Sequence, residues 1–181
     1  MMKIKRVFLG IPLSEEIKDK LHPVLISLKD TNLDLKFVAL DNIHLTIAFL
    51  GNVDHAQLDK IVADYIELLK EYKPFTIVAE GIGAFPSLSK IQVMWVGIKS
   101  QELRDLIQES ESLYNLEQKE IIPHITIARY KSAKGKSILR KEIERNKDLS
   151  FGTQLVDKII LYESTLTPEG PIYKILKEFI L

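Results

Sequence analysis

The sequence predicts an α+β protein in which a mainly antiparallel sheet forms two similar lobes, with helices on its outer side. Segments of strand type follow one another through short connections, which favours antiparallel pairs, and no glycine-rich phosphate loop follows any of them. The motif HxTxA occurs twice, at residues 44–48 and 124–128. We therefore expect two halves related by a pseudo-twofold axis around a central cleft. No Gly, Ser or Pro linker separates them, so residues 1–181 should form a single domain.

Composition and charge exclude several classes of function. The chain has 25 basic and 25 acidic residues, so no global field attracts it to nucleic acid or to a membrane, and any contact with phosphate must be local. It contains no cysteine, which excludes disulfides, thiolate metal sites and a cysteine nucleophile. The first apolar stretch is interrupted by Pro12, and no segment reaches a membrane-spanning length. We expect a cytoplasmic protein without membrane contact.

The first quarter of the chain predicts a strand, a helix and a hairpin. Residues 5–13 are of strand type, and Ser14 is a helix N-cap followed by acid in the first turn. The helix should run toward residue 29, although Pro23 should end or kink it. Residues 35–40 and the first motif strand, 43–51, are separated by the turn pair Asp41-Asn42, which predicts a hairpin that carries His44.

The middle of the chain alternates between helical and strand patterns. Asp54 can cap a helix whose apolar residues recur at three- and four-residue spacing through residue 69. Residues 74–85 form a strand in which Gly81 and Gly83 suit a bulge or a close backbone approach. A loop over 86–90 leads to a strand over 91–98, and helical spacing returns over 102–116.

The last third should begin with the second motif strand and end with two more strands. The motif strand covers residues 121–130, and Pro123 fixes an extended conformation just before His124. A basic segment over 131–147 should be partly helical. The final strands are expected near 153–162 and 172–180, on either side of a proline- and glycine-containing loop over 167–171.

The two HxTxA motifs are the candidate functional residues. Alternation along a strand puts His44, Thr46 and Ala48 on one face, and His124, Thr126 and Ala128 repeat the arrangement. Strand propensity rewards Thr and Ile but gives no reason for His, so the repeat favours a functional role. Two such strands could face each other across a cleft. One imidazole could then act as base and the other as acid, while the hydroxyls bind phosphoryl oxygens and the small alanines leave room for a ligand.

Other kinds of catalytic site have little support. The chain has four histidines and no HExxH pairing, so neither a catalytic metal nor another cofactor is expected. His22 and His55 are interpreted as surface residues. No GxSxG motif marks a serine nucleophile.

Several segments of the chain resemble a known family. HLTI at 44–47 and HITI at 124–127 resemble the paired HxTx motifs of the 2H phosphoesterase superfamily. A narrower resemblance, to the bacterial and archaeal RNA 2′,3′-cyclic phosphodiesterases, also called 2′-5′ RNA ligases, spans nearly the whole chain. It rests on these segments: RVFLGIPL, DNIHLTIAFLGNVD, PFTIVAEGIGAFPS, MWVGI, PHITIAR and LYESTLTPEGPIYKIL.

This resemblance implies a two-lobed fold and metal-free hydrolysis of RNA 2′,3′-cyclic phosphate ends to a 2′-phosphate. It implies that His44 donates a proton to the leaving oxygen and that His124 accepts one from water, with Thr46 and Thr126 on the phosphate. From the sequence alone the two histidine roles could be swapped. The expected partner is RNA with a 2′,3′-cyclic phosphate end or a small cyclic nucleotide, and the expected state is a monomer. Two alternatives stay open, namely reversible 2′-5′ ligation and a non-catalytic nucleotide- or RNA-binding module.

Arg129 matches the family pattern HxTxAR and would bind phosphate. Simple alternation, however, puts it on the face of Ile125 and Ile127, so that only a twist or bulge would bring it to the site. Tyr130, on the His124 face, and Trp95 could stack on a base, or they could belong to the core. The basic segment over 131–147 could contact an RNA backbone or be a solvated face.

Overall fold

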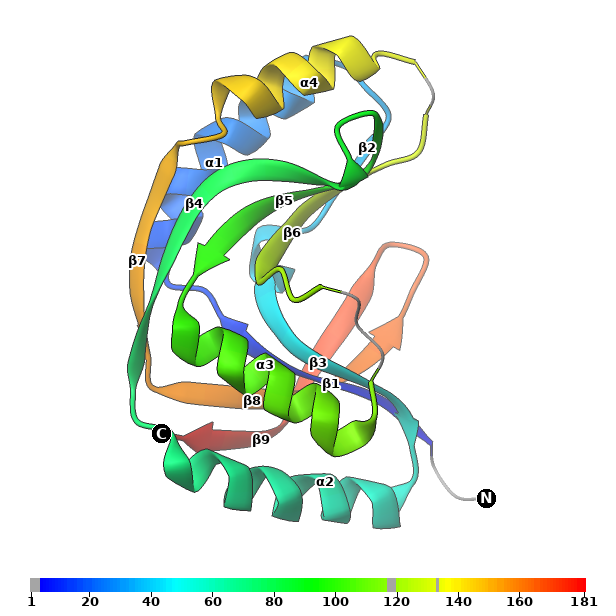
Figure 1. The fold of residues 1–181 in the computed structure, drawn as a ribbon. Helices are drawn as coiled ribbons and strands as arrows, with labels where there is room; N and C mark the ends of the chain where they lie inside the picture. The colour runs from blue at the N-terminus through cyan, green and yellow to red at the C-terminus, as the bar shows by residue number, and fades with distance from the viewer. Residues whose placement is uncertain (1–3, 117–119, 133) are drawn as a thin grey trace.

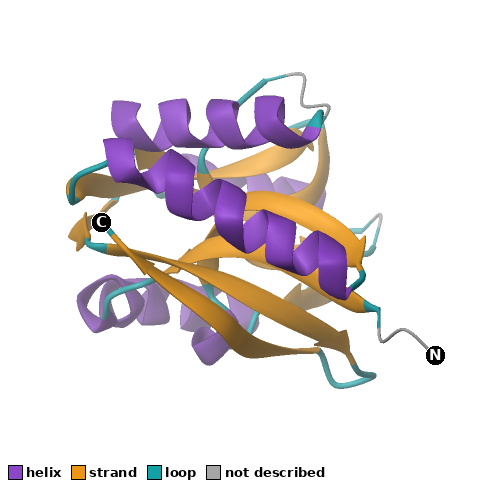
Figure 2. Cartoon of the chain, turned by 90° about the horizontal axis from the view of Figure 1, so that it is seen from below, coloured by secondary structure: helices purple, strands orange, loops and turns teal. Residues whose placement is uncertain are grey.

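The computed structural model describes residues 4–116, 120–132 and 134–181. In these residues one curled antiparallel sheet has four α-helices on its outer side (Figures 1 and 2), which confirms the predicted fold class. The strands are β1 (Lys5–Pro12), β2 (Leu35–Phe37), β3 (His44–Val53), β4 (Phe75–Ser87), β5 (Lys90–Lys99), β6 (His124–Tyr130), β7 (Ser150–Val156), β8 (Lys158–Leu166) and β9 (Pro171–Ile180). The helices are α1 (Glu15–Asp30), α2 (His55–Leu68), α3 (Gln101–Tyr114) and α4 (Lys136–Arg145), with short 3-10 turns η1 (Leu40–Asn42) and η2 (Leu69–Glu71).

The order of the strands is symmetric about the two motif strands. It runs β7-β4-β5-β6-β3-β1-β8-β9, with β2 added beside β6, so β6 and β3 meet in the middle. Helices α1 and α4 pack against β7 and β4, while α2 and α3 pack against β9 and β3. The C-terminal hairpin of β8 and β9 rises into the open side of the curl (Figure 1). Among the described residues, no helix has the length and apolarity needed to cross a bilayer.

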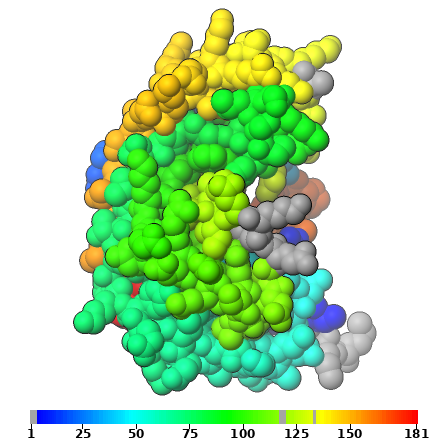
Figure 3. All heavy atoms as spheres, viewed as in Figure 1, coloured from blue at the N-terminus to red at the C-terminus, as the bar shows by residue number. Residues whose placement is uncertain are grey.

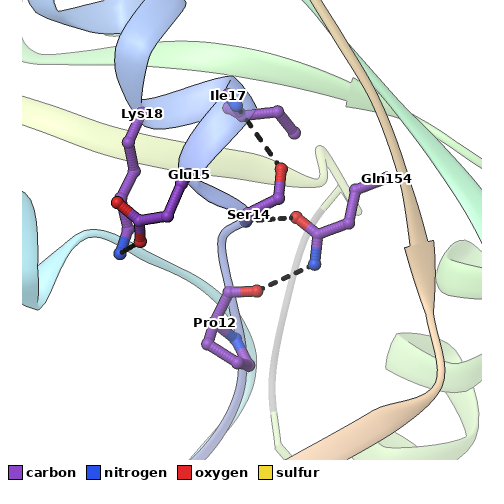
Figure 4. A network of polar contacts seen from close by, with 6 residues as sticks. All are labelled: Pro12, Ser14, Glu15, Ile17, Lys18 and Gln154. Atoms are coloured by element: carbon purple, nitrogen blue, oxygen red, sulfur yellow. Dashed lines mark hydrogen bonds and ion pairs between the residues drawn. The ribbon is translucent and has the colours of Figure 1, made fainter.

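The start of α1 links the two halves of the sheet. Ser14 caps the helix as predicted, because its Oγ accepts the backbone N–H of Ile17 at 3.4 Å. The backbone N–H of Ser14 donates to Gln154 Oε1 at 2.8 Å, and Gln154 Nε2 donates to the carbonyl oxygen of Pro12 at 2.9 Å (Figure 4). One β7 side chain therefore holds the end of β1, although these strands lie in opposite halves.

Helix α1 does not end at Pro23, so that prediction is wrong. The helix continues to Asp30, and Pro23 lies on its exposed side. Water can reach the backbone carbonyl that the proline leaves unbonded on that side. The apolar stripe of Leu21, Leu25 and Leu28 is buried on both sides of the proline, and this packing offsets its cost.

The predicted hairpin before His44 is also wrong. Strand β2 pairs with β6, with Leu35 opposite Tyr130, and η1 leads from it into β3. The reason lies in the rest of the sheet: β3 pairs with β1 on one side and with β6 on the other, so it has no free edge for β2.

The expected strand over 153–162 is two strands that part at Asp157. Strand β7 pairs with β4, whereas β8 pairs with β1 at the other end of the sheet. The chain thus ends with three strands and not two, because one apolar run supplies strands to both halves.

The glycines of β4 behave as predicted. The register shifts between Glu80 and Ile82, and Gly81 there has a φ of +74°, a bulge conformation that few other residues adopt. Gly83 lies under the indole of Trp95, where a Cβ would come within 2.2 Å of the ring. Part of the basic segment forms α4, as expected, while residue 133 lies outside the described residues.

Candidate active site

The two motif strands are neighbours in one sheet, with Leu45 directly opposite Ile125. Opposite residues of an antiparallel pair point to the same face, and both of these side chains are buried in the core. The residues next to them, His44 and Thr46 on β3, therefore share the other face with their counterparts on β6. The motifs lie side by side on the inner face of the curl instead of facing each other from opposite walls.

The inner face is open to solvent. The helices cover the outer side, and the space-filling view is hollowed on the open side, between the β4–β5 half and the β3 half (Figure 3). His44, Thr46, His124 and Thr126 are each partly exposed, whereas the residues that alternate with them in the motifs are buried. A ligand can therefore reach all four side chains from this side.

Both imidazoles are oriented by the same contact. His44 Nδ1 lies 2.7 Å from the backbone oxygen of Asn42, and His124 Nδ1 lies 2.7 Å from that of Ile122. A carbonyl oxygen only accepts, so each Nδ1 carries a proton and donates it. Each Nε2 is left to exchange a proton with a ligand.

Burial lowers the pKa of both histidines, and the hydrogen bond to the backbone opposes this in part. The positive charge of Arg129 lowers the pKa of His124 further. Both rings are therefore neutral at neutral pH, which leaves each Nε2 with a lone pair.

A bulge at the same position in each motif changes which side chains reach the inner face. The pairing of β1 with β3 skips Ile47, and the pairing of β5 with β6 skips Ile127. One extra residue reverses the alternation that follows it. Ala48 and Ala128 consequently point into the core, with exposed fractions of 1% and 0%, and the expectation that they line the site is wrong.

The same bulge brings Arg129 to the inner face. Arg129 is exposed, and its charge acts on His124. The bulge that simple alternation required for this residue to reach the site is therefore present. Tyr130 moves the other way: it is 5% exposed and belongs to the core, which contradicts its expected place beside His124.

Aromatic rings flank the two histidines in a similar way. The ring of Phe8 lies 4.8 Å from that of His44, and the ring of Phe85 lies 4.8 Å from that of His124. Tyr173 meets His44 edge-on at 5.2 Å, while Trp95, a residue that the sequence singled out, lies 6.3 Å from His124. Phe8, Phe85 and Tyr173 were missed because their strands are distant in sequence from either motif.

Other candidate residues lie away from this face. His22 and His55 are exposed on α1 and α2, and His55 contacts Asp59 at 2.9 Å. The hollow between α2 and α3 is lined by Leu68 and Leu113 together with several carboxylates, which disfavours a phosphate there. Across the described ranges, no three His, Cys, Asp or Glu side chains come together as a set of metal ligands.

Comparisons with known proteins agree with the internal repeat. The model of a family described as LigT-like phosphoesterase matches residues 11–95 and again residues 96–173. An RNA 2′,3′-cyclic phosphodiesterase of Methanocaldococcus jannaschii is 37% identical over 178 residues, covering 96% of this chain and 99% of that protein. One of Aquifex aeolicus is 32% identical over 190 residues, covering 99% of each.

Two solved structures share the fold. TT0787 of Thermus thermophilus superposes with a TM-score of 0.81 at 26% identity, covering 97% of both chains. E. coli LigT complexed with NADP+ superposes with a TM-score of 0.69 at 23% identity, covering 99% of both chains.

Proposed function

The chain belongs to the LigT-like phosphoesterase family, and from this premise we propose that it hydrolyses RNA 2′,3′-cyclic phosphate ends to 2′-phosphomonoesters by a metal-independent, two-histidine mechanism. The observation that carries the proposal is the arrangement of the two imidazoles. They share one face of two neighbouring strands, and each has its Nδ1 bonded to the backbone and its Nε2 available. This arrangement suits proton transfer on both sides of one phosphorus atom.

The reaction needs a base, an acid and oxygen donors. Nε2 of His124 takes a proton from water as the water oxygen attacks phosphorus. The bond from phosphorus to the ribose 3′-oxygen breaks, and His44 gives that oxygen a proton, which leaves a 2′-phosphate. The hydroxyls of Thr46 and Thr126 and the guanidinium of Arg129 hold the non-bridging oxygens, on which negative charge is concentrated in the transition state.

The charge of Arg129 supports this assignment of roles. It acts on His124 and favours the neutral ring that a base requires, whereas the shift of His44 has no contribution from Arg129. His44 must carry a proton when the substrate is bound. The negative charge of the cyclic phosphate raises the pKa of a nearby imidazole and so promotes this protonation.

The proposed substrate is an RNA end or a small cyclic nucleotide, and the proposed working state is a monomer. The relatives from Methanocaldococcus and Aquifex are named for action on RNA 2′,3′-cyclic phosphate. E. coli LigT, which has the same fold, has been solved in complex with NADP+ and with 3′-AMP, so a protein of this fold binds nucleotides.

Product analysis tests the proposal. A defined oligoribonucleotide that ends in 2′,3′-cyclic phosphate is incubated with the protein and a chelator, and its end group is identified by phosphorus NMR. The expected product is a 2′-phosphate. A 3′-phosphate, or activity only after metal is added, would contradict the mechanism. A joined 2′,5′ product from a strand with a free 5′-hydroxyl would favour ligation, and tight binding without turnover would favour a binding module.

A further inference from the structure

A row of side chains extends along the inner face from the histidines to the edge of the sheet. Phe8 lies on this face against His44. The β1–β3 register skips residues of β3 but none of β1. Alternation along β1 is therefore unbroken, and Arg6 shares the face of Phe8. Tyr162 is opposite Phe8 on β8, and Tyr173 is opposite Ser164 on β9. Continuing the β1–β8 register by one residue brings Arg6 opposite Ser164, so Arg6, Ser164 and Tyr173 form one row.

Tyr173 has a fixed position relative to His44. Its ring meets the imidazole edge-on, at an interplanar angle of 86°, and lies 5.0 Å from the ring of Phe8. Asn42 links the start of β9 to the start of β3. Its Nδ2 donates to the carbonyl oxygen of Pro171 at 2.8 Å, and its own backbone oxygen accepts from His44 Nδ1. The residue that orients the catalytic ring thus also holds the start of β9.

The charges of two guanidinium groups act on the Tyr173 hydroxyl. Burial raises the pKa of this phenol, while the positive charges of Arg6 and Arg129 oppose the rise. Both arginines are exposed, and none of the ion pairs or side-chain hydrogen bonds among the described residues involves either of them. Glu163, a nearby carboxylate on β8, points to the other face and contacts Lys5 at 3.4 Å. The surface beside His44 therefore carries hydrogen-bond donors and positive charge. None of the three residues of the row, Arg6, Ser164 and Tyr173, is a carboxylate that would neutralise this charge.

We propose that Arg6 and Tyr173 form a second phosphate subsite, beside the one to which Arg129 is assigned, and that it binds the phosphodiester on the 5′ side of the terminal nucleotide of an RNA strand. This inference rests on the proposed function, because it assumes that the cyclic phosphate lies between the histidines. Arginine binds phosphate oxygens through paired N–H donors, and the phenol adds a third donor. A cyclic mononucleotide has no such phosphodiester, so the subsite selects an RNA end over a free nucleotide.

The test compares three substrates that differ in this one group. They are a 2′,3′-cyclic mononucleotide, a dinucleotide that ends in 2′,3′-cyclic phosphate, and the same dinucleotide with an uncharged methylphosphonate linkage. The measured quantity is the ratio of kcat/KM for the charged dinucleotide to kcat/KM for the mononucleotide. The wild type should prefer the charged dinucleotide to both others.

Variants identify the residues responsible. Arg6→Gln should lower the ratio by about tenfold, as expected for the loss of one charge-assisted hydrogen bond. Tyr173→Phe should lower it by about threefold, since a neutral donor contributes less. Lys174→Gln is the matched control: Lys174 neighbours Tyr173 on β9, points to the other face and is exposed, so the ratio should stay at the wild-type value.

Two results would overturn the subsite. One is an unchanged ratio in Arg6→Gln, whether kcat/KM on the mononucleotide and the dinucleotide is retained or falls equally on both. The other is equal use of the charged and uncharged dinucleotides by the wild type. If the wild type turns over none of the substrates, the proposed function has failed instead. The subsite is then tested by calorimetry with a dinucleotide ending in 2′-phosphate: Arg6→Gln should weaken its binding about tenfold, and equal binding by wild type and variant would reject the subsite.

Discussion

Leu45 lies directly opposite Ile125 where β3 meets β6, and this one pair sets the geometry of the candidate site. Because both side chains point into the core, the histidine and threonine on either side of each point to the inner face. A slip of one residue in this register would turn one motif into the core. The buried Leu45–Ile125 pair therefore places the two motifs side by side on one face, which neither motif could ensure alone.

The threonine hydroxyls should contribute to catalysis through the phosphate. Thr46→Val and Thr126→Val keep the side-chain shape and remove a hydrogen bond to an anionic oxygen. Each should lower kcat/KM by about tenfold or more, as expected for a hydrogen bond to a charged group. Steady-state kinetics on a cyclic-phosphate end measures the effect, and Thr153→Val on β7 provides a matched control. Wild-type rates in both motif variants would exclude the hydroxyls from the site.

The pH profile should distinguish the base from the acid. Arg129→Gln removes the charge that lowers the pKa of His124, so the pKa of that ring rises. If His124 is the base, the acidic limb of kcat/KM against pH moves to higher pH while the alkaline limb stays. Arg145→Gln, on α4, should leave both limbs in place. Movement of the alkaline limb instead would mean that His124 is the acid.

Burial of the two imidazoles should also make stability depend on pH. Their folded-state pKa values lie below the ordinary value of 6.5, so in acid the unfolded chain binds more protons than the folded one. This contribution to stability is fully present above pH 6.5 and is lost as the pH falls through the lowered values. Urea unfolding should show a steeper fall in the free energy of unfolding for the wild type than for His44→Gln/His124→Gln. Equal slopes would mean that the rings are not desolvated.

Gly83→Ala tests the contact beneath Trp95. The added Cβ would come within 2.2 Å of the indole, which also packs at 5.2 Å against Phe85. The ring must shift, at a cost of about 1–3 kcal/mol in the free energy of unfolding. Because Trp95 is the single tryptophan of the chain, its fluorescence reports the shift directly. An unchanged spectrum together with unchanged stability would contradict the packing.

Local patterns in the sequence predict much of this fold. The stripe on α2, the caps at Ser14 and Asp54 and the bulge at Gly81 depend on neighbouring residues, and the structure has each of them. The repeated motif likewise predicts that His44 and His124 share one site. These features could be predicted because period, capping and φ preference act over a few residues.

The features that sequence reasoning missed depend on distant parts of the chain. All the strands compete to pair with the edge of β6. Strand β2 pairs there instead of with β3. The bulges at Ile47 and Ile127 contain no glycine and have no local signal, yet they decide that Arg129 reaches the inner face and that Ala48 does not. Tyr173 comes next to His44 only because β9 follows β8 at the end of the sheet.

The most direct test of the central claim is a double-mutant cycle on the rate of cyclic-phosphate hydrolysis. If His44 and His124 act on one phosphate, His44→Ala and His124→Ala should each lower kcat by about 10²- to 10⁴-fold with the fold intact by circular dichroism. The double variant should then be about as slow as either single variant, because residues that act as a unit do not add. Losses that multiply in the double variant, or a wild-type rate in either single variant, would contradict a shared site.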